Sequence, residues 1–217
     1  TALGFNQAKE EALSQPGVSD TWSVVGQAFE EDERLRIRRS WLIGRSTAQR
    51  ALILEFTIVG VPGAASIDAS LVTGSQFVGE LCFYPSSSPL RALIKSRGDA
   101  TPCALNLGPA LDATLGQGLD RFARVLAANP WTPRLSFVAP SVCPIRLGAS
   151  WALVDSEARA LPLSPRFVSS IHHWRLLTIS GGAPLSICAE WDGEFLTPLA
   201  AATPSGPIED LAQKWVA

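Results

Sequence analysis

The chain has 217 residues, a formal net charge of −2, 47% hydrophobic residues and 18% charged residues. A chain of this length buries roughly 70% of its unfolded surface, so it can form one large β domain or two small ones without disulfides or metals. The near-neutral charge argues against a general nucleic-acid binder, which usually has a basic excess or a basic stripe. No uninterrupted apolar run reaches the roughly 18 residues of a membrane-spanning helix, so the sequence excludes such a helix.

Cysteine usage and the chain ends indicate the compartment. No basic and apolar leader opens the chain, so we expect the protein in the cytoplasm and away from the membrane. The four cysteines are far apart and form no C-x-x-C pair, which predicts buried free thiols. The chain contains no methionine, even at its first position, and we therefore expect it to be one piece of a longer protein.

Residues 1–19 form a predicted N-terminal helical segment, with a helix over Phe5–Leu13 that ends before Pro16. Residues 20–100 form the first predicted β module. Its strands alternate in polarity or are rich in β-branched and aromatic residues, and turn-forming residues separate them. The five predicted strands are Trp22–Gln27, Glu33–Trp41, Arg50–Val59, Gln76–Tyr84 and Leu90–Lys95.

A connector and one helix occupy residues 101–130. Apolar residues recur at helical spacing from Ala110 to Ala128, and Asn129-Pro130 ends this pattern. Gly116 and Gly118 lie within the pattern, and we predict a break there because glycine disfavours a helix interior.

Residues 131–217 form the second predicted β module with a C-terminal tail. Its early strands are Leu135–Val138, Trp151–Val154 and Leu161–Leu163, with a hairpin loop between the last two. The stretch from His173 to Ala200 is predicted as a strand, a Gly-Gly-Ala-Pro turn, a second strand and a short third strand. Asp192-Gly193 precedes the third strand and favours a tight two-residue turn with positive φ at both positions.

These elements predict a mostly-β protein of the α+β class, in which one helix bridges two small strand-rich modules. Each module is expected to be a twisted sheet or a partly open barrel. The chain has seven tryptophans against one tyrosine. We expect the tryptophans of the predicted strands to fill the β cores with their indole N–H groups hydrogen-bonded. They are Trp22, Trp41, Trp151, Trp174 and Trp191.

Three arginines form the patterned basic feature of the chain. Strand alternation places Arg34, Arg36 and Arg38 on one face of the second predicted strand, where they could bind phosphate or carboxylate groups. The alternative is local neutralisation, because the acidic run Glu30–Glu33 precedes them and can pair with them across a neighbouring strand. These arginines are the candidate binding residues of the sequence.

The sequence shows no catalytic or metal-binding motif. His172 and His173 are adjacent, so in a strand they would point to opposite faces and could not easily hold one metal ion. No G-x-S-x-G nucleophile motif and no glycine-rich phosphate loop is present. We therefore assign no catalytic residue, no metal ligand and no cofactor. Four carboxylates could pair in space in a way that sequence cannot show: Asp68, Glu80, Glu190 and Asp192.

Three tracts taken together resemble a known family. They are DTWSVVGQAFEEDERLRIRRSWLIG at Asp20–Gly44, GELCFYPSSSPLRALI at Gly79–Ile94 and WRLLTISGGAPLSICAEWDGEFLTPL at Trp174–Leu199. They resemble the C-terminal region of bacterial SWIM zinc-finger family proteins, and the tract that begins at Gly79 is the most specific. In that family a zinc motif of a C-x-C pair followed by C-x-H lies upstream and is associated with DNA or protein interaction. This chain has no C-x-C pair, so the resemblance implies the non-zinc portion of a longer protein and no metal ligand here.

The resemblance and the absence of catalytic motifs predict a non-catalytic protein-interaction or scaffolding region of a larger bacterial SWIM-type protein. Its expected partners are other domains of the same protein or a separate protein. One alternative is a nucleic-acid-binding accessory domain that uses the strand with Arg34, Arg36 and Arg38. A second alternative is an unrecognised hydrolase with a site between the modules. The sequence favours a protein without enzymatic activity and leaves the partner and the oligomeric state open.

Overall fold

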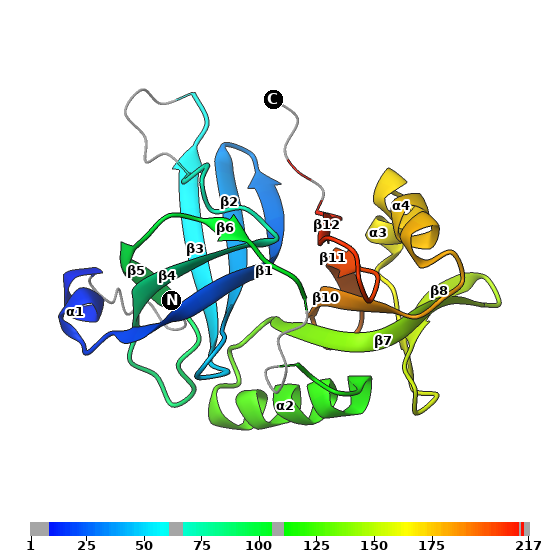
Figure 1. Ribbon diagram of the computed structural model, residues 1–217. Helices are drawn as coiled ribbons and strands as arrows, with labels where there is room; N and C mark the ends of the chain where they lie inside the picture. Colours follow the sequence, from blue (N-terminus) through cyan, green and yellow to red (C-terminus); the bar gives the residue numbers. More distant parts are fainter. Residues whose placement is uncertain (1–8, 61–66, 106–110, 213, 215–217) are drawn as a thin grey trace. The chain divides into compact units, whose positions relative to one another are not determined.

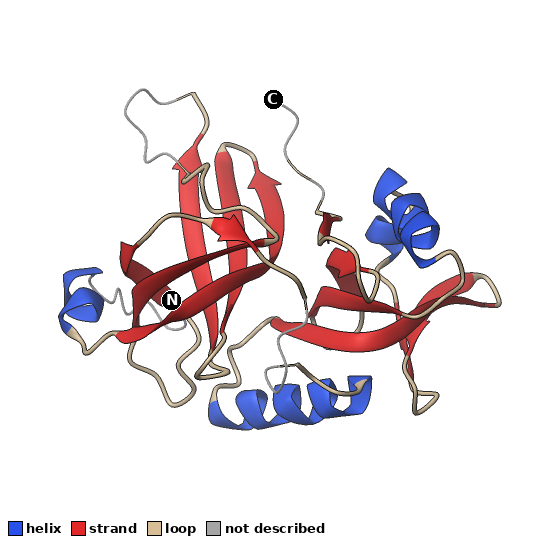
Figure 2. Ribbon diagram, in the orientation of Figure 1, coloured by secondary structure: helices blue, strands red, loops and turns tan. Residues whose placement is uncertain are grey.

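The computed structural model of the chain describes residues 9–60, 67–105, 111–212 and 214. It is strand-rich, with two antiparallel sheets and few helices, which confirms the predicted mostly-β class with two strand-rich modules (Figures 1 and 2). The chain divides into two compact units, and the boundary lies between Pro102 and Cys103. The predicted connector, residues 101–130, is therefore divided, and its helix belongs to the second unit.

The described residues of the first unit form one short helix and an antiparallel sheet in the order β3-β2-β1-β4-β5, with β6 also paired to β4. The sheet is nearly closed into a barrel, because β3 meets the residues just before β5, where the Leu52 backbone N–H donates to the Leu90 carbonyl at 2.8 Å. The elements are α1 (Lys9–Ser14), β1 (Val18–Asp32), β2 (Leu35–Gly44), β3 (Arg50–Ile58), β4 (Ser75–Phe83), β5 (Ala92–Arg97) and β6 (Thr101–Pro102). The part of the predicted N-terminal helix before residue 9 lies outside the described residues.

Apolar side chains fill the inside of this barrel. Because residues alternate between the two faces of a strand, one set from each strand points inward. Trp22 is fully buried there, and its indole N–H donates to the Gly79 carbonyl at 3.2 Å. The cluster comprises Trp22, Val24, Leu42, Ala51, Ile53, Leu71, Phe77, Leu81 and Ala92.

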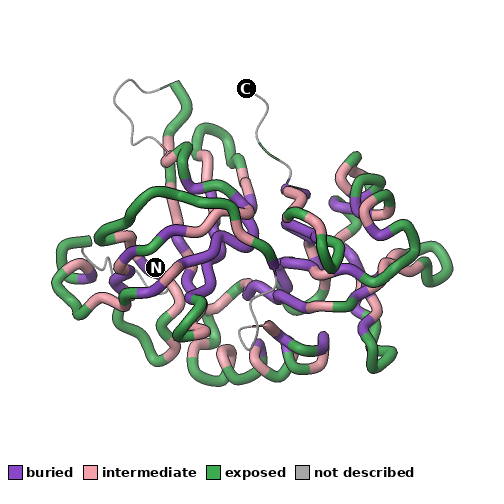
Figure 3. The backbone as a smooth tube through the Cα atoms, viewed as in Figure 1, coloured by how far each residue is buried: buried purple, intermediate pink, exposed green. Residues whose placement is uncertain are grey.

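The second unit is built on an antiparallel sheet in the order β12-β11-β10-β7-β8-β9. In Figure 3 the buried stretches of this unit run along β7, β10 and β11, while the hairpin loops and much of α4 are exposed. Its helices are α2 (Leu115–Ala128), α3 (Pro165–Val168) and α4 (Ile171–Ser180). Its strands are β7 (Leu135–Leu147), β8 (Ser150–Val154), β9 (Ala160–Pro162), β10 (Leu185–Trp191), β11 (Leu196–Ala202) and β12 (Glu209–Asp210).

Helix α2 runs without interruption through both of its glycines, so the predicted break is wrong. A Cβ atom at Gly118 would lie 2.7 Å from two ring carbons of Phe137 on β7. The glycine therefore lets the helix approach the sheet closely, and this packing outweighs its poor helix propensity. The helix begins after Thr114, whose hydroxyl accepts the Gln117 backbone N–H at 3.3 Å.

The segment predicted as a strand at His173 is helix α4. Ser170 caps its first turn by accepting the His172 backbone N–H at 3.2 Å, and Gly181 ends it with φ of 52°. The buried residues follow helical rather than strand spacing: His173, Leu176 and Ser180. Trp174 consequently lies on the outer face of the helix with 64% of its surface exposed, and the prediction that it fills a β core is wrong.

The β10–β11 hairpin is confirmed, but its turn is longer than the predicted two residues. Four residues separate Trp191 from Leu196, and Gly193 alone among them has positive φ, at 100°. The Asp192 carboxylate accepts the backbone N–H groups of Glu194 at 2.9 Å and Phe195 at 2.8 Å. The aspartate thus orders the loop through its side chain, which a primed two-residue turn would not require. No helix among the described residues has the length and apolar content needed to cross a membrane.

Candidate functional site

The three candidate arginines do not form one exposed row. Arg34 lies in the turn between β1 and β2 and is exposed, whereas Arg36 is half-buried on β2. Arg38, on the same strand, is only 4% exposed and points into the first unit. One ligand at the surface therefore cannot meet all three guanidinium groups.

Arg38 is held by a buried ion pair. Its Nε donates to Glu55 Oε2 on β3 at 2.8 Å, and its two terminal nitrogens donate to the carbonyls of Asp68 at 2.6 Å and Leu71 at 3.3 Å. Glu55 Oε1 in turn accepts the Asp68 backbone N–H at 2.9 Å. Gln27 also donates to the Leu71 carbonyl, at 2.9 Å. This pair ties the segment that enters β4 to the inside of the barrel, which is a structural role.

Arg36 and the neighbouring Arg39 pair with the acidic run before them. Of the three candidate arginines, only Arg36 shows the local neutralisation that the sequence offered as the alternative, since Arg38 pairs with Glu55. Glu31 and Arg36 are register partners on β1 and β2, and their side chains lie 3.3 Å apart. Arg39 forms an ion pair with Glu30 at 2.8 Å. Opposite charges across an antiparallel pair stabilise it modestly, so these charges are accounted for by the strand pairing itself.

A patch of apolar side chains lies on the outer face of β2 and β3. Leu42 and Ile53 point into the core, so the residues of opposite parity on these regular strands point outward. Leu35 is the register partner of Ile58, and Ile37 is the register partner of Phe56. We call this patch the β2–β3 apolar face: Leu35, Ile37, Leu54, Phe56 and Ile58.

The β2–β3 apolar face is open to solvent at the end where β2 begins and β3 ends. Phe56 is 42% exposed, Ile58 is 48% exposed and Leu35 is 36% exposed. Two acidic residues of β1, Glu30 and Asp32, are the register partners of Ile37 and Leu35 and border the face on that side. Glu30 is paired with Arg39, which is the register partner of Leu54, so the face is a partly exposed apolar strip with a margin of both charges. The alternation of β2 and β3 was visible in sequence, but which parity faced the solvent was not.

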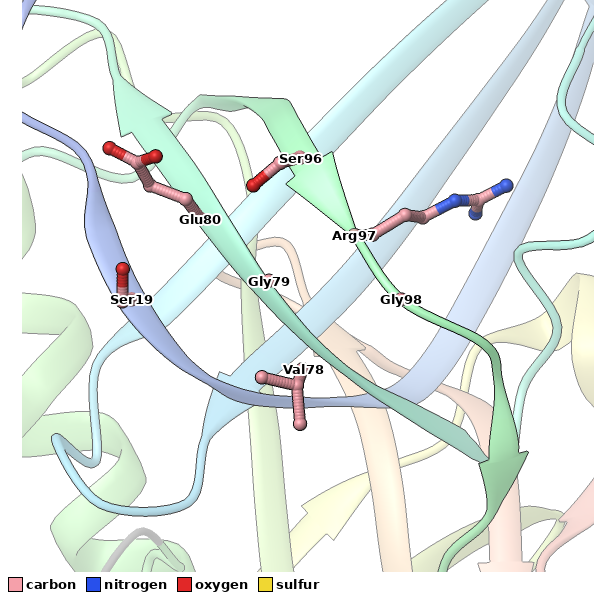
Figure 4. Close-up of a pocket in the computed structure, with 7 residues that line it drawn as sticks. All are labelled: Ser19, Val78, Gly79, Glu80, Ser96, Arg97 and Gly98. Atoms are coloured by element: carbon pink, nitrogen blue, oxygen red, sulfur yellow. The ribbon is translucent and has the colours of Figure 1, made fainter.

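A shallow groove of about 340 Å³ lies over β1, β4 and β5 of the same unit (Figure 4). In Figure 4 the side chains of Ser19, Glu80 and Ser96 lie together on one side, and Arg97 points away. Glu80 accepts a hydrogen bond from Lys95 at 3.0 Å, and this bond with the Glu80 charge raises the pKa of Lys95. No residue that lines the groove is a histidine or a second carboxylate that could activate a serine hydroxyl. The groove thus lacks a catalytic pair.

Three of the four carboxylates singled out by the sequence have separate local partners, and the fourth, Glu190, is buried on β10 of the second unit. Asp68 contacts Arg97 at 2.8 Å, Glu80 contacts Lys95 at 3.0 Å, and Asp192 orders its own loop. Asp20 is buried, which raises its pKa, but hydrogen bonds led by the Thr47 side chain outweigh the burial and lower the pKa overall. Asp20 fixes the turn between β2 and β3 in this way, which is again a structural task.

His173 is enclosed by aromatic rings of the second unit. It is 3% exposed, and its ring centroid lies 4.8 Å from that of Trp151 and 6.3 Å from that of Phe167. Burial lowers the pKa of His173, and a hydrogen bond with the Val168 backbone opposes this effect without cancelling it. Its Nε2 has no hydrogen-bond partner among the described residues. A neutral, enclosed imidazole of this kind packs the core and does not act as a surface base.

We predict that His173 makes the stability of the protein depend on pH. The folded pKa lies below the ordinary value of 6.5, so the unfolded chain binds more protons as the pH falls through 6.5. The free energy of unfolding should therefore decrease from pH 6.5 downward until the folded pKa is reached. Urea unfolding between pH 5 and 7.5 measures this decrease. The variant His173→Phe should lose the decrease and His172→Gln should keep it, and a decrease that persists in His173→Phe would contradict the assignment.

The described part of the chain contains no group of three histidine, cysteine, aspartate or glutamate side chains able to hold a metal ion. All four cysteines are free; Cys82 and Cys188 are buried, and Cys103 and Cys143 are partly exposed. Other exposed apolar side chains, such as Ile171 and Trp174 on α4, are present, but the β2–β3 apolar face joins exposed apolar residues across two paired strands. No family model, no curated protein and no solved structure matches this chain.

Proposed function

We propose that this chain is a non-catalytic protein-interaction or scaffolding region and that it acts through the β2–β3 apolar face. The observation that carries the proposal is the pairing of outward apolar residues across two neighbouring strands: exposed Leu35 with exposed Ile58, and half-buried Ile37 with exposed Phe56. Single exposed apolar residues are common on protein surfaces, whereas a continuous apolar strip is typical of an interaction site.

The resemblance to the C-terminal region of bacterial SWIM zinc-finger proteins supports the same function. Under this proposal the chain is part of a larger cytoplasmic SWIM-type protein, and its partner is another domain of that protein or a separate protein. Burying the exposed side chains of the β2–β3 apolar face would contribute enough free energy to support binding of a partner. Fully burying a Phe or Ile side chain contributes roughly 1.5–3 kcal/mol, and Phe56 and Ile58 keep nearly half of their surface exposed.

Placing a charge on the β2–β3 apolar face should abolish partner binding. We expect Phe56→Glu to weaken binding by at least about tenfold, because a carboxylate buried in an apolar interface without a partner costs more than about 1.4 kcal/mol. The protein most enriched on the immobilised chain from its native cell extract is purified, and its Kd for the wild type and for the variant is measured.

Val78→Glu provides the matched control for this experiment. Val78 is 69% exposed on β4 of the same sheet but lies outside the β2–β3 apolar face. Circular dichroism and the urea midpoint must show that both variants are folded. Equal binding by wild type and Phe56→Glu would overturn the proposed function, as would a loss of binding in Val78→Glu of the same size.

A further inference from the structure

The outer edge of β3 carries unpaired backbone groups next to the β2–β3 apolar face. β3 lies beside β2 (Figure 1) and pairs with it from Arg50 to Ile58. On the other side of β3 the Leu52 N–H donates to the Leu90 carbonyl. Backbone groups of alternate residues point to the same side of a strand, so those of Leu54, Phe56 and Ile58 point in the same direction as that of Leu52. Among the described residues no backbone hydrogen bond reaches these three.

The segment nearest to this edge approaches β3 in a different way. Asp68 is bonded to β3 through the Glu55 side chain, which belongs to the inward set of residues with Arg38. Within the described part of the chain, Asp68 forms no backbone hydrogen bond with β3. The edge therefore offers alternating donors and acceptors, which only another extended backbone can satisfy along their full length.

We propose that β3 pairs antiparallel with β3 of a second copy of this chain, centred on Phe56. In this register Phe56 faces Phe56 of the second copy, and Leu54 faces Ile58 of the second copy. Each of these is a hydrogen-bonded pair, so the free N–H and C=O groups of all three residues are satisfied on both copies. The contact is two-fold symmetric and therefore closes as a dimer. The inference rests on the proposed function, because it assigns an occupant to the same surface.

The side chains of β3 suit this self-pairing on both faces of the joined sheet. On the outer face Leu54, Phe56 and Ile58 meet apolar residues of the second copy and extend the β2–β3 apolar face across the symmetry axis. On the inner face Glu55 lies opposite Thr57 of the second copy, so no like charges face each other. Glu55 is already paired with Arg38. A helix or a nucleic acid on this strip would form no strand pairing with the edge backbone groups.

Engineered disulfides test the register directly, in a Cys103→Ser, Cys143→Ser background that removes the two partly exposed thiols. A Phe56→Cys pair would have Cα atoms about 5.5 Å apart, within the range that a disulfide spans. Ile58→Cys is the matched control, because Ile58 is similarly exposed but would lie roughly 13 Å from its own copy across the axis. Under mild oxidation Phe56→Cys should form a covalent dimer and Ile58→Cys should not. Equal cross-linking of both variants, or of neither, would overturn the proposed pairing.

Sedimentation of the purified chain separates this inference from the proposed function. The wild type should reach twice its monomer mass as its concentration rises. Phe56→Lys and Phe56→Glu should each stay monomeric, because like charges would face each other at the axis, and mixing the two should restore the dimer. A wild type that stays monomeric at every concentration would overturn the self-pairing. If such a monomer still lost its protein partner through Phe56→Glu, the proposed function would stand without it.

Discussion

Replacing Glu55 with Gln should destabilise the first unit by about 3–5 kcal/mol, because the buried Arg38 guanidinium would lose its counter-charge. The Arg38 side chain is 5% exposed and that of Glu55 is 18% exposed, so water can screen this charge only weakly. The side-chain amide that replaces the carboxylate would also present its NH2 group either to the two Arg38 nitrogens or to the Asp68 N–H, and both positions need an acceptor. Urea unfolding followed by tryptophan fluorescence measures the loss, because Trp22 lies in the core of the same unit.

A double variant distinguishes the cost of a buried unpaired charge from the loss of the ion pair itself. Arg38→Met with Glu55→Leu removes both charges and should recover part of the stability lost in Glu55→Gln. The recovery is expected to be incomplete, because the Asp68 and Leu71 carbonyls each lose a donor. A double variant less stable than Glu55→Gln would contradict this expectation. It would show that the intact ion pair and its hydrogen bonds stabilise the fold by more than an unpaired Arg38 charge destabilises it.

Replacing Asp155 with Ala should destabilise the second unit by about 2–4 kcal/mol. Its carboxylate accepts the Leu115 backbone N–H at 2.7 Å and those of Glu157 and Arg159 at 3.0 and 2.9 Å. Asp155 thus joins the first turn of α2 to the β8–β9 hairpin, and it also places a negative charge at the helix N-terminus. The same urea titration reports the loss.

Two further variants locate the Asp155 effect. Asp155→Asn keeps one oxygen acceptor and should lose less stability than Asp155→Ala. Ser156→Ala changes an exposed neighbour in the same loop and should stay within about 0.5 kcal/mol of the wild type. An unchanged midpoint in Asp155→Ala would mean that solvent replaces all three hydrogen bonds, and the proposed link between helix and hairpin would then be wrong.

Strand positions were largely predictable from alternation and from turn residues, because both are local properties. The strands near Arg50, Gln76 and Trp151 were found within one residue of their true ends, whereas the strand predicted at Trp22–Gln27 is the middle of the longer β1. Helix α4 was missed although its signals were present: Ser170 before it and Gly181 after it are the ordinary caps of a helix. Its apolar run was assigned to a strand because short apolar segments do not distinguish the two structures by periodicity.

The candidate arginines show the limit of sequence reasoning at the site. Alternation correctly assigned Arg36 and Arg38 to one face of a strand, but three arginines in alternation suggested a face turned to solvent. The nearly closed barrel turns this face inward and supplies Glu55 from β3 as the partner for Arg38. Phe56 and Ile58 on β3 are thereby turned outward. No local pattern carries this information, because it depends on which strands meet.

The amino-acid sequence by itself determined the strand-rich class, the main turns and the lack of any catalytic or metal motif, since these follow from residue type and spacing. The tertiary structure alone decided which side of β2 and β3 is the interior, and so which residues form the β2–β3 apolar face. The physical reason is that burial belongs to the closed sheet as a whole. A strand specifies two faces, and only its neighbours determine which of them water reaches.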